Sequence, residues 1–299
     1  MYVSFRIPTL LLGLLVTAAP VRAQAAPEDG GASDASTAEM LFASIEWQDG
    51  PDTAHVGAES KVVVPENCRF TGAPGARTFM VVTENPPSGN ELGVLLCQSS
   101  EEGEPWFVVF SFDDSGYVRD DDAGELDADA ILKTLQEGNR QGNAERRSRG
   151  WGTTTLTGWV RAPYYEPRTN NLTWATNLRD DASSEITVNH SVRLLGRGGV
   201  MHADLVIDPS QLTATMPEFD RIVSTHQFVS GRRYSEWREG DKLAAYGVTA
   251  LVAGGAGAIA AKSGLLAKFA KFIWVGVLGA LAWLRSLFSG RKQEREDAQ

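Results

Sequence analysis

No motif of a familiar catalytic class occurs in this chain of 299 residues. The missing patterns are the Gly-x-Ser-x-Gly nucleophile elbow, Ser-x-x-Lys, His-Glu-x-x-His and a phosphate-binding glycine-rich loop. The segment Gly196-Arg-Gly-Gly199 fails the dinucleotide fingerprint because Met201 stands where its last glycine belongs. The four histidines have no metal-ligand spacing. The sequence therefore predicts no catalytic residue and no cofactor.

Positive charge is also scarce, since 28 Lys and Arg face 38 Asp and Glu, a formal net charge of −10. Residues 24–241 hold 35 of the acidic and 18 of the basic residues, a formal charge of −17. An acidic surface repels phosphate backbones and anionic headgroups, so we expect no nucleic-acid partner. Residues 242–299 instead carry a formal charge of +5, which suits the edge of a membrane.

Only two cysteines are present, Cys68 and Cys97. In an exported chain an even pair is most simply a disulfide, and two buried thiols are the alternative. Each cysteine stands beside an apparent strand, but spacing alone does not show that their Cα atoms approach within about 7 Å. We therefore predict a Cys68–Cys97 bond.

Long apolar runs are concentrated near the C-terminus. Leu243–Ala261 is uncharged, and after a Lys262-Ser263-Gly264 break a second apolar run covers Leu265–Phe288. A helix needs about 20 apolar residues to cross a bilayer, so residues 242–289 are predicted to be a transmembrane anchor, followed by a charged tail at 290–299. The glycines in the first run favour two crossings as a helical hairpin over a single crossing.

The N-terminus has the pattern of a secretory signal peptide at residues 1–23. A short positively charged start precedes a short apolar core, and Val21-Arg22-Ala23 places small residues at the cleavage positions. The alternative is an uncleaved anchor. Residues 24–55 are expected to form a flexible leader, because Gln24–Ala38 is rich in Ala, Ser, Gly and Asp.

Between leader and anchor, the apolar pattern predicts an α+β ectodomain: an antiparallel sheet with packed helices, in two subdomains at 56–150 and 151–241. In the first, short apolar runs indicate strands, and Asp127 caps a helix that closes the subdomain. The elements expected there are strands at Lys61–Val64, Leu92–Leu96 and Trp106–Phe112 and a helix at Pro74–Thr83.

The second subdomain has strand character at four places: Leu156–Val160, Leu172–Leu178, Glu185–Leu195 and Val200–Asp208. The last two are predicted to pair as a hairpin, in which Leu194 faces Met201 and Val192 faces Ala203. Both apolar sets then lie on one side, as a hairpin requires.

The other side of this predicted hairpin carries a polar group. Arg193 stands across from His202, and Ser191 across from Asp204. We interpret these as cross-strand pairs on a solvated face. His190, on the apolar face, is expected to be a core residue rather than a base.

An acidic run lies within the first subdomain: Asp113, Asp114, Asp120, Asp121, Asp122, Glu125, Asp127 and Asp129. Clustered carboxylates can hold Ca²⁺, and the candidates here would be Asp120, Asp121, Asp122 and Asp127. An EF-hand alignment starting at Asp120 fails, because Gly124 occupies a ligand position. The favoured interpretation is a solvated loop leading into a helix N-terminus, with no metal.

Several short motifs, in a fixed order, carry a family resemblance. They are Gly116–Ala123, Gly158-Trp159, Pro163–Tyr165, Leu172–Ala175, Asn189–Val200, Gly231–Tyr234 and Asp241–Gly247. Between Val56 and Phe288 the chain resembles an uncharacterised family of bacterial proteins described as predicted membrane-anchored proteins, a domain of unknown function. That family has an aromatic residue in place of Cys68 and no cysteine in place of Cys97, and two departures together favour the disulfide.

The resemblance implies a bacterial envelope location and a membrane tether. We therefore expect an inner-membrane protein with its ectodomain in the periplasm, whose partners are the lipid bilayer and an envelope protein. Its expected role is a non-catalytic binding or scaffold module. The alternative is an envelope hydrolase or a calcium-binding protein using the region Asp120–Asp122.

Overall fold

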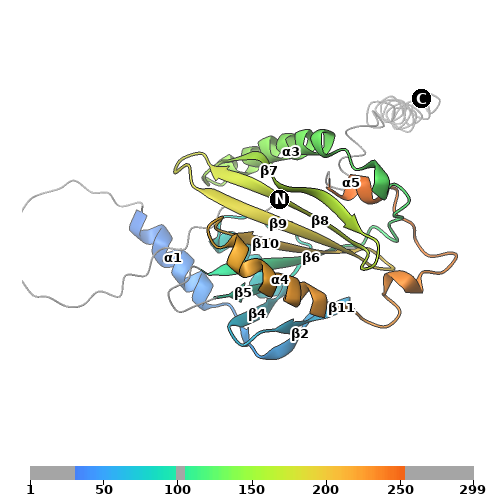
Figure 1. Cartoon of the computed structure of the whole chain (residues 1–299). Helices are drawn as coiled ribbons and strands as arrows, with labels where there is room; N and C mark the ends of the chain where they lie inside the picture. Colours follow the sequence, from blue (N-terminus) through green and yellow to red (C-terminus); the bar gives the residue numbers. More distant parts are fainter. Residues whose placement is uncertain (1–30, 99–104, 253–299) are drawn as a thin grey trace, which may run out of the picture.

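A computed structural model of the chain describes residues 31–98 and 105–252 (Figure 1). The expected signal peptide at 1–23, the second apolar run at 265–288 and the tail at 290–299 lie outside these residues. The described chain is α+β, with a large antiparallel sheet and several helices, as the sequence predicted.

Eight strands form the main sheet, in the order β1-β4-β5-β6-β10-β9-β8-β7, and every neighbouring pair is antiparallel. The strands are β1 (Gln48–Asp49), β4 (Cys68–Gly72), β5 (Glu91–Cys97), β6 (Trp106–Asp113), β7 (Thr154–Glu166), β8 (Asn171–Asp180), β9 (Ile186–Leu195) and β10 (Val200–Ile207). Because β6 pairs with β10, one continuous sheet joins strands from before and after the subdomain boundary expected at residue 150.

The predicted β9–β10 hairpin is confirmed in its register. Leu194 pairs with Met201 and Val192 pairs with Ala203. Side chains alternate between the faces of a strand, so these four residues lie on one face of the sheet. All four are buried in the largest apolar cluster.

This first face is covered by helix α4 (Leu212–Thr225) and by a small sheet of β2 (Asp52–Val56), β3 (Ser60–Val64) and β11 (Gln227–Phe228), in the order β11-β3-β2. Phe219 and Ile222 of α4 pack against the sheet, and His190 meets the Phe219 ring edge-on. Figure 1 shows α4 lying across the sheet beside β10.

The second face is covered in two separate places. Helix α2 (Ala73–Val82) packs over the β5–β6 end with Phe79 and Met80. Helix α3 (Ala128–Ser148) and the short helix α5 (Val248–Val252) pack over the β7–β9 end, with Ile131, Leu251 and Val252. Two short 3₁₀ turns, η1 (Ala123–Glu125) and η2 (Tyr234–Glu236), complete the described elements.

Cys68 and Cys97 face each other directly on β4 and β5 and form a disulfide, as predicted. Their Cα atoms are 4.1 Å apart, well within reach of the bond. Cross-strand pairing therefore supplied the proximity that sequence spacing could not establish.

The expected leader at 24–55 differs from the structure within its described part. Residues 31–55 contain helix α1 (Gly31–Ala43), β1 and most of β2. Phe42 and Trp47 explain the order, because their rings pack around Phe79 of α2 at centroid distances of 6.3 and 6.2 Å. Two aromatic anchors outweigh the Ala- and Ser-rich composition.

Helix α3 also differs from its expected role. It runs unbroken through Gly138 and Gly142 and packs against β7 rather than over the strands before it. Asn139 and Asn143 hydrogen-bond the backbone of Thr154 and Leu156, so the helix also protects one end of this edge strand. Its N-cap is Asp127, as predicted, which accepts from Ala130 N at 2.9 Å.

The expected first membrane span, Leu243–Ala261, requires a correction. Leu243 bridges to Tyr117, the Tyr246 hydroxyl donates to Asp113 at 2.7 Å, and Val248, Leu251 and Val252 are buried in the core. Residues 243–252 therefore belong to the folded domain, because this apolar stretch supplies core side chains. Residues 253–261 lie outside the described part.

Within residues 31–98 and 105–252, none of the helices combines the length and the apolar character that a membrane crossing requires.

The disulfide generates a stability prediction. Replacing both cysteines, Cys68→Ala and Cys97→Ala, should lower the free energy of unfolding by about 2–4 kcal/mol, because the bond constrains the unfolded chain. Urea unfolding of the oxidised wild type and of the double variant measures this difference. Equal midpoints, or two freely alkylated thiols in the native protein, would contradict it.

Candidate functional site

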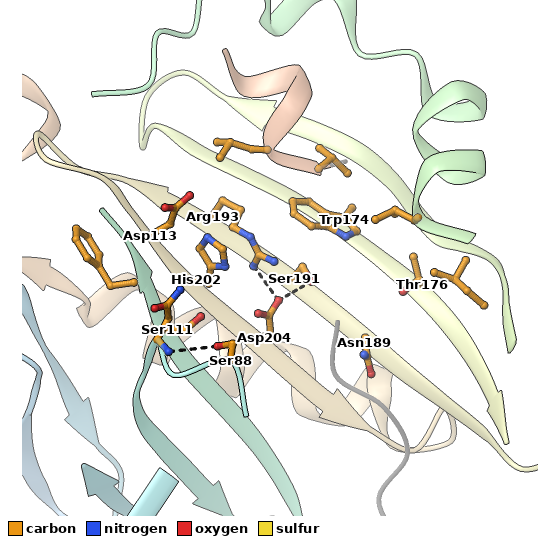
Figure 2. Close-up of a pocket in the computed structure, with 16 residues that line it drawn as sticks. Ser88, Ser111, Asp113, Trp174, Thr176, Asn189, Ser191, Arg193, His202 and Asp204 are labelled. Atoms are coloured by element: carbon orange, nitrogen blue, oxygen red, sulfur yellow. Dashed lines mark hydrogen bonds and ion pairs between the residues drawn. The ribbon is translucent and has the colours of Figure 1, made fainter. Parts of the chain in front are cut away.

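A pocket of about 290 Å³ opens on the second face of the sheet, in the gap between the two apolar clusters. Strands β6, β8, β9 and β10 form its floor, and α3, α5 and the loop before β5 contribute its walls. Figure 2 shows Arg193, His202 and Asp204 pointing into this space. The pocket thus occupies the middle of the sheet, between α2 on one side and the α3–α5 pair on the other.

Strand alternation places a polar stripe on the pocket floor. Along β10, Val206 belongs to the apolar cluster under α2 and Val200 to the cluster under α3 and α5. Asp204 and His202 lie between them on the same face. The stripe continues onto the neighbouring strands, through Ser111 on β6, Asn189, Ser191 and Arg193 on β9 and Thr176 on β8.

Asp204 is the most deeply buried charged residue of this stripe, with only 3% of its surface exposed. One carboxylate oxygen, Oδ1, accepts from Ser191 Oγ at 2.6 Å and from Arg193 Nη1 at 2.8 Å (Figure 2). Burial alone would raise the pKa of Asp204, but the charge of Arg193 and these hydrogen bonds hold it below its usual value. Asp204 is therefore an ionised carboxylate in a buried position.

Arg193 is held from two sides. Its guanidinium carbon lies 4.7 Å from the centre of the Trp174 ring, a cation–π arrangement, while Nη1 bonds Asp204. Arg193 itself is only 9% exposed. The two charges are thus fixed in place by an aromatic ring on β8 and a register set by β9 and β10.

His202 is neutral at ordinary pH. Burial and the adjacent Arg193 charge together lower its pKa to about 3, against the opposing effect of the Asp204 charge. An imidazole with so low a pKa is a weak general base near neutral pH.

Three buried atoms on the pocket floor have no hydrogen-bond partner among the described residues: Arg193 Nε, His202 Nε2 and Asp204 Oδ2. An unpartnered buried polar group typically costs about 1–3 kcal/mol. Such atoms at the floor of a pocket are consistent with a partner that enters the pocket.

The pocket walls are fixed by other carboxylates. Glu91, 1% exposed, accepts from Ser88 N, Ser88 Oγ and Gly89 N at 2.6, 2.7 and 2.9 Å, which shapes the loop at Ser88 and Asn90. Asp122 accepts from Val248 N at 2.9 Å and also from the Thr249 hydroxyl, and so holds the start of α5. Asp127 caps α3.

The four calcium candidates from the sequence do not share one site. Asp120 accepts from the Tyr165 hydroxyl at 2.7 Å, Asp122 binds α5, Asp127 caps α3, and Asp121 is exposed. Across the part of the chain that the structure describes, no three metal-ligating side chains converge. The carboxylates of the acidic run cap helices and accept hydrogen bonds from tyrosine hydroxyl groups. Among the described residues they therefore do not form a set of calcium ligands.

The prediction of a solvated face for the polar residues of the β9–β10 hairpin is wrong. Arg193, Ser191 and Asp204 are buried on a covered face, not on the solvated face expected from the sequence. The reason is that α3 and α5, both distant in sequence, fold over that side of the sheet. The cross-strand pairing itself, Arg193 with His202 and Ser191 with Asp204, is as predicted.

Sequence reasoning missed Ser111, Trp174, Thr176 and Asn189, which also line the pocket. A polar residue inside an otherwise apolar strand, such as Ser111 in Trp106–Asp113, was the available signal. Ser191 Oγ donates to Asp204 rather than to an imidazole, so it is not arranged as an activated nucleophile.

Comparison with known proteins gives a family and no activity. A family model described as "Protein of unknown function (DUF2167)" matches residues 48–284. No curated protein matches the chain. Among solved structures, the chain is similar to the solution structure of cyanobacterial PsbP (CyanoP) from Synechocystis sp. PCC 6803, at 13% identity and a TM-score of 0.35, over 62% of this chain and 93% of that one. So low a similarity carries no argument about function.

Breaking the buried ion pair should be costly. Asp204→Ala leaves the Arg193 charge uncompensated, and we expect the free energy of unfolding to fall by about 3–5 kcal/mol. Asp208→Ala is the matched control, because Asp208 is exposed just after β10 and accepts from Ser210, and its loss should cost about 1 kcal/mol or less. Similar urea midpoints for the two variants would show that Asp204 is not buried in an ion pair.

His202 generates a pH prediction. In the folded protein the pKa of His202 is about 3, below the value near 6.5 in the unfolded chain. As the pH falls from about 6.5 toward 3, the unfolded state therefore binds a proton and the folded state does not. Stability should therefore decrease with acidification, by about 2 kcal/mol between pH 7 and pH 5 from this residue alone. His202→Gln should remove this part of the pH dependence of urea unfolding and leave the parts that come from His190 and His226, whose pKa values burial also lowers to about 4. The exposed His55→Gln should leave the dependence unchanged. An unchanged slope in His202→Gln would contradict the buried neutral imidazole.

Proposed function

We propose that this chain, which belongs to the family of proteins of unknown function DUF2167, is a membrane-anchored binding module of the bacterial envelope. Membership confirms the resemblance drawn from the short motifs between Val56 and Phe288. The family supplies no reaction, so the proposal depends on the chain's own geometry.

The single observation that carries the binding function is the pocket on the second face of the main sheet. Its floor holds a buried ion pair, Arg193 with Asp204, and α3 and α5 give it an apolar wall of Leu135, Leu251 and Val252. Ligand sites commonly combine apolar walls with a few fixed polar groups. A non-catalytic role is favoured because the imidazole of His202 is a poor base and the Ser191 hydroxyl donates to Asp204.

The anchor of the proposed module is the second apolar run, Leu265–Phe288. The first run contributes residues 243–252 to the folded core, and the nine residues left at 253–261 are fewer than the roughly 20 that a crossing needs. Lys268, Lys271 and Arg285 stand near the ends of the second run, where long side chains reach the interface. A single crossing therefore replaces the hairpin expected from the glycines of the first run.

The proposed side of the membrane is the periplasm. A signal peptide at 1–23 would export the domain, and a disulfide is typical of proteins in an oxidising compartment. With one crossing, the basic residues Arg291, Lys292 and Arg295 then lie in the cytoplasm, as the positive-inside rule favours.

The anchor is tested by fractionation and topology. The full chain should stay with membranes in high salt and in carbonate and be released by detergent, because apolar contact rather than surface charge holds it. A reporter fused after Gln299 should be active only if it works in the cytoplasm. Release by carbonate would contradict the anchor, and a periplasmic reporter signal would contradict the single crossing.

The binding role is tested on protein purified from its own membranes. Native mass spectrometry in detergent should show a mass above that of the processed chain, and denaturation should release a small molecule in about equimolar amount. Protein that carries no such molecule, and takes none up from an extract of small molecules, would contradict a binding module.

A further inference from the structure

The donor and acceptor pattern of the pocket floor restricts what can bind there. Asp204 Oδ2 only accepts hydrogen bonds, Arg193 Nε–H only donates them, and the neutral imidazole of His202 does either at Nε2. An ammonium group only donates, so it cannot accept a hydrogen bond from Arg193 Nε. An ionised carboxylate or phosphate only accepts, so it cannot donate a hydrogen bond to Asp204 Oδ2. A hydroxyl group does both.

The charges on the pocket floor also favour a ligand without a net charge. Arg193 and Asp204 neutralise each other at 2.8 Å, and His202 carries no charge. The remaining carboxylate, Asp113, lies at the half-buried rim and accepts from the Tyr246 hydroxyl. A charged ligand would lose its hydration at a floor with no net charge to compensate it, so an uncharged polar ligand is favoured.

The dimensions fit a single small ring. A volume of about 290 Å³ is near the lower end of ligand pockets, which span roughly 300–1,000 Å³. It is also far more than one water needs, since each water occupies about 30 Å³ in the liquid. The space therefore suits a molecule of monosaccharide size.

The walls add an amphipathic requirement. Opposite the polar stripe lie Leu135 of α3 and Leu251 and Val252 of α5, with Leu156 and Trp174 at the β7–β8 side. A bound molecule must therefore offer hydroxyl groups to the floor and C–H surface to the walls. A sugar ring has both, since its hydroxyl groups project from the ring edge and its faces are C–H groups.

From these observations we propose that the pocket binds an uncharged polyhydroxylated molecule with a ring of monosaccharide size. Hydroxyl groups of the ligand donate to Asp204 Oδ2 and accept from Arg193 Nε, while its C–H face contacts the apolar wall. This inference rests on the proposed function, because it names the ligand class of the same pocket.

The test uses the full chain in a detergent without a sugar headgroup. Isothermal titration with N-acetylglucosamine, glucose and galactose is compared with putrescine as an amine and succinate as a carboxylate. We expect at least one monosaccharide to bind saturably, with one site per chain, and neither charged probe to bind.

A matched pair of variants on β8 locates the site. Thr176 lies on the pocket floor, whereas Thr173 pairs with the core residue Val192 on the opposite face. Thr176→Val should weaken monosaccharide binding about tenfold, since it removes one hydroxyl without changing the side-chain shape. Thr173→Val makes the same replacement outside the pocket and should leave binding unchanged.

The outcomes separate the ligand class from the binding role. Binding of putrescine or succinate alone would overturn the ligand class and leave the binding module standing. Equal weakening by both threonine variants would overturn the location in the pocket. If none of the five probes binds, the ligand class is overturned, and the mass measurement on membrane-derived protein decides separately whether the binding role falls with it.

Discussion

Burial of the Asp204 carboxylate in the middle of the main sheet is the constraint on which the second face depends. An ionised carboxylate removed from water must be paired and hydrogen-bonded, and here Arg193 and Ser191 do this from the next strand. The β9–β10 register brings these three side chains together and places polar groups in the middle of the second face. Coverage of this face is consequently divided between α2 on one side and α3 with α5 on the other. The pocket is the space that this division leaves.

The sequence predicted the local part of this arrangement well. Alternation along β9 and β10 gave the correct register and the correct core face, because a one-residue slip would expose Leu194 and Met201. It could not tell whether the polar face meets water or a covered pocket, since both look the same along one strand. The answer depends on α5, whose residues lie more than forty positions after β10.

Long-range contacts also explain the remaining differences. An apolar run such as Leu243–Ala261 suits a bilayer or a core equally well in the sequence. The contacts of Tyr246 and Leu251 with distant residues assign its first part to the core. The acidic run poses the same difficulty. The capping role of Asp127 is local and was predicted, whereas Asp122 binds Val248, 126 residues away. Carboxylates that resemble a metal site in sequence thus hold the two helices that wall the pocket.

The claim that this pocket is a ligand site is tested most directly by a high-resolution crystal structure of the full protein purified from its native source. We predict electron density for one bound ring-shaped molecule that bridges Arg193 Nε and Asp204 Oδ2. A pocket that contains only ordered water, or that is closed by another segment of this chain, would contradict it.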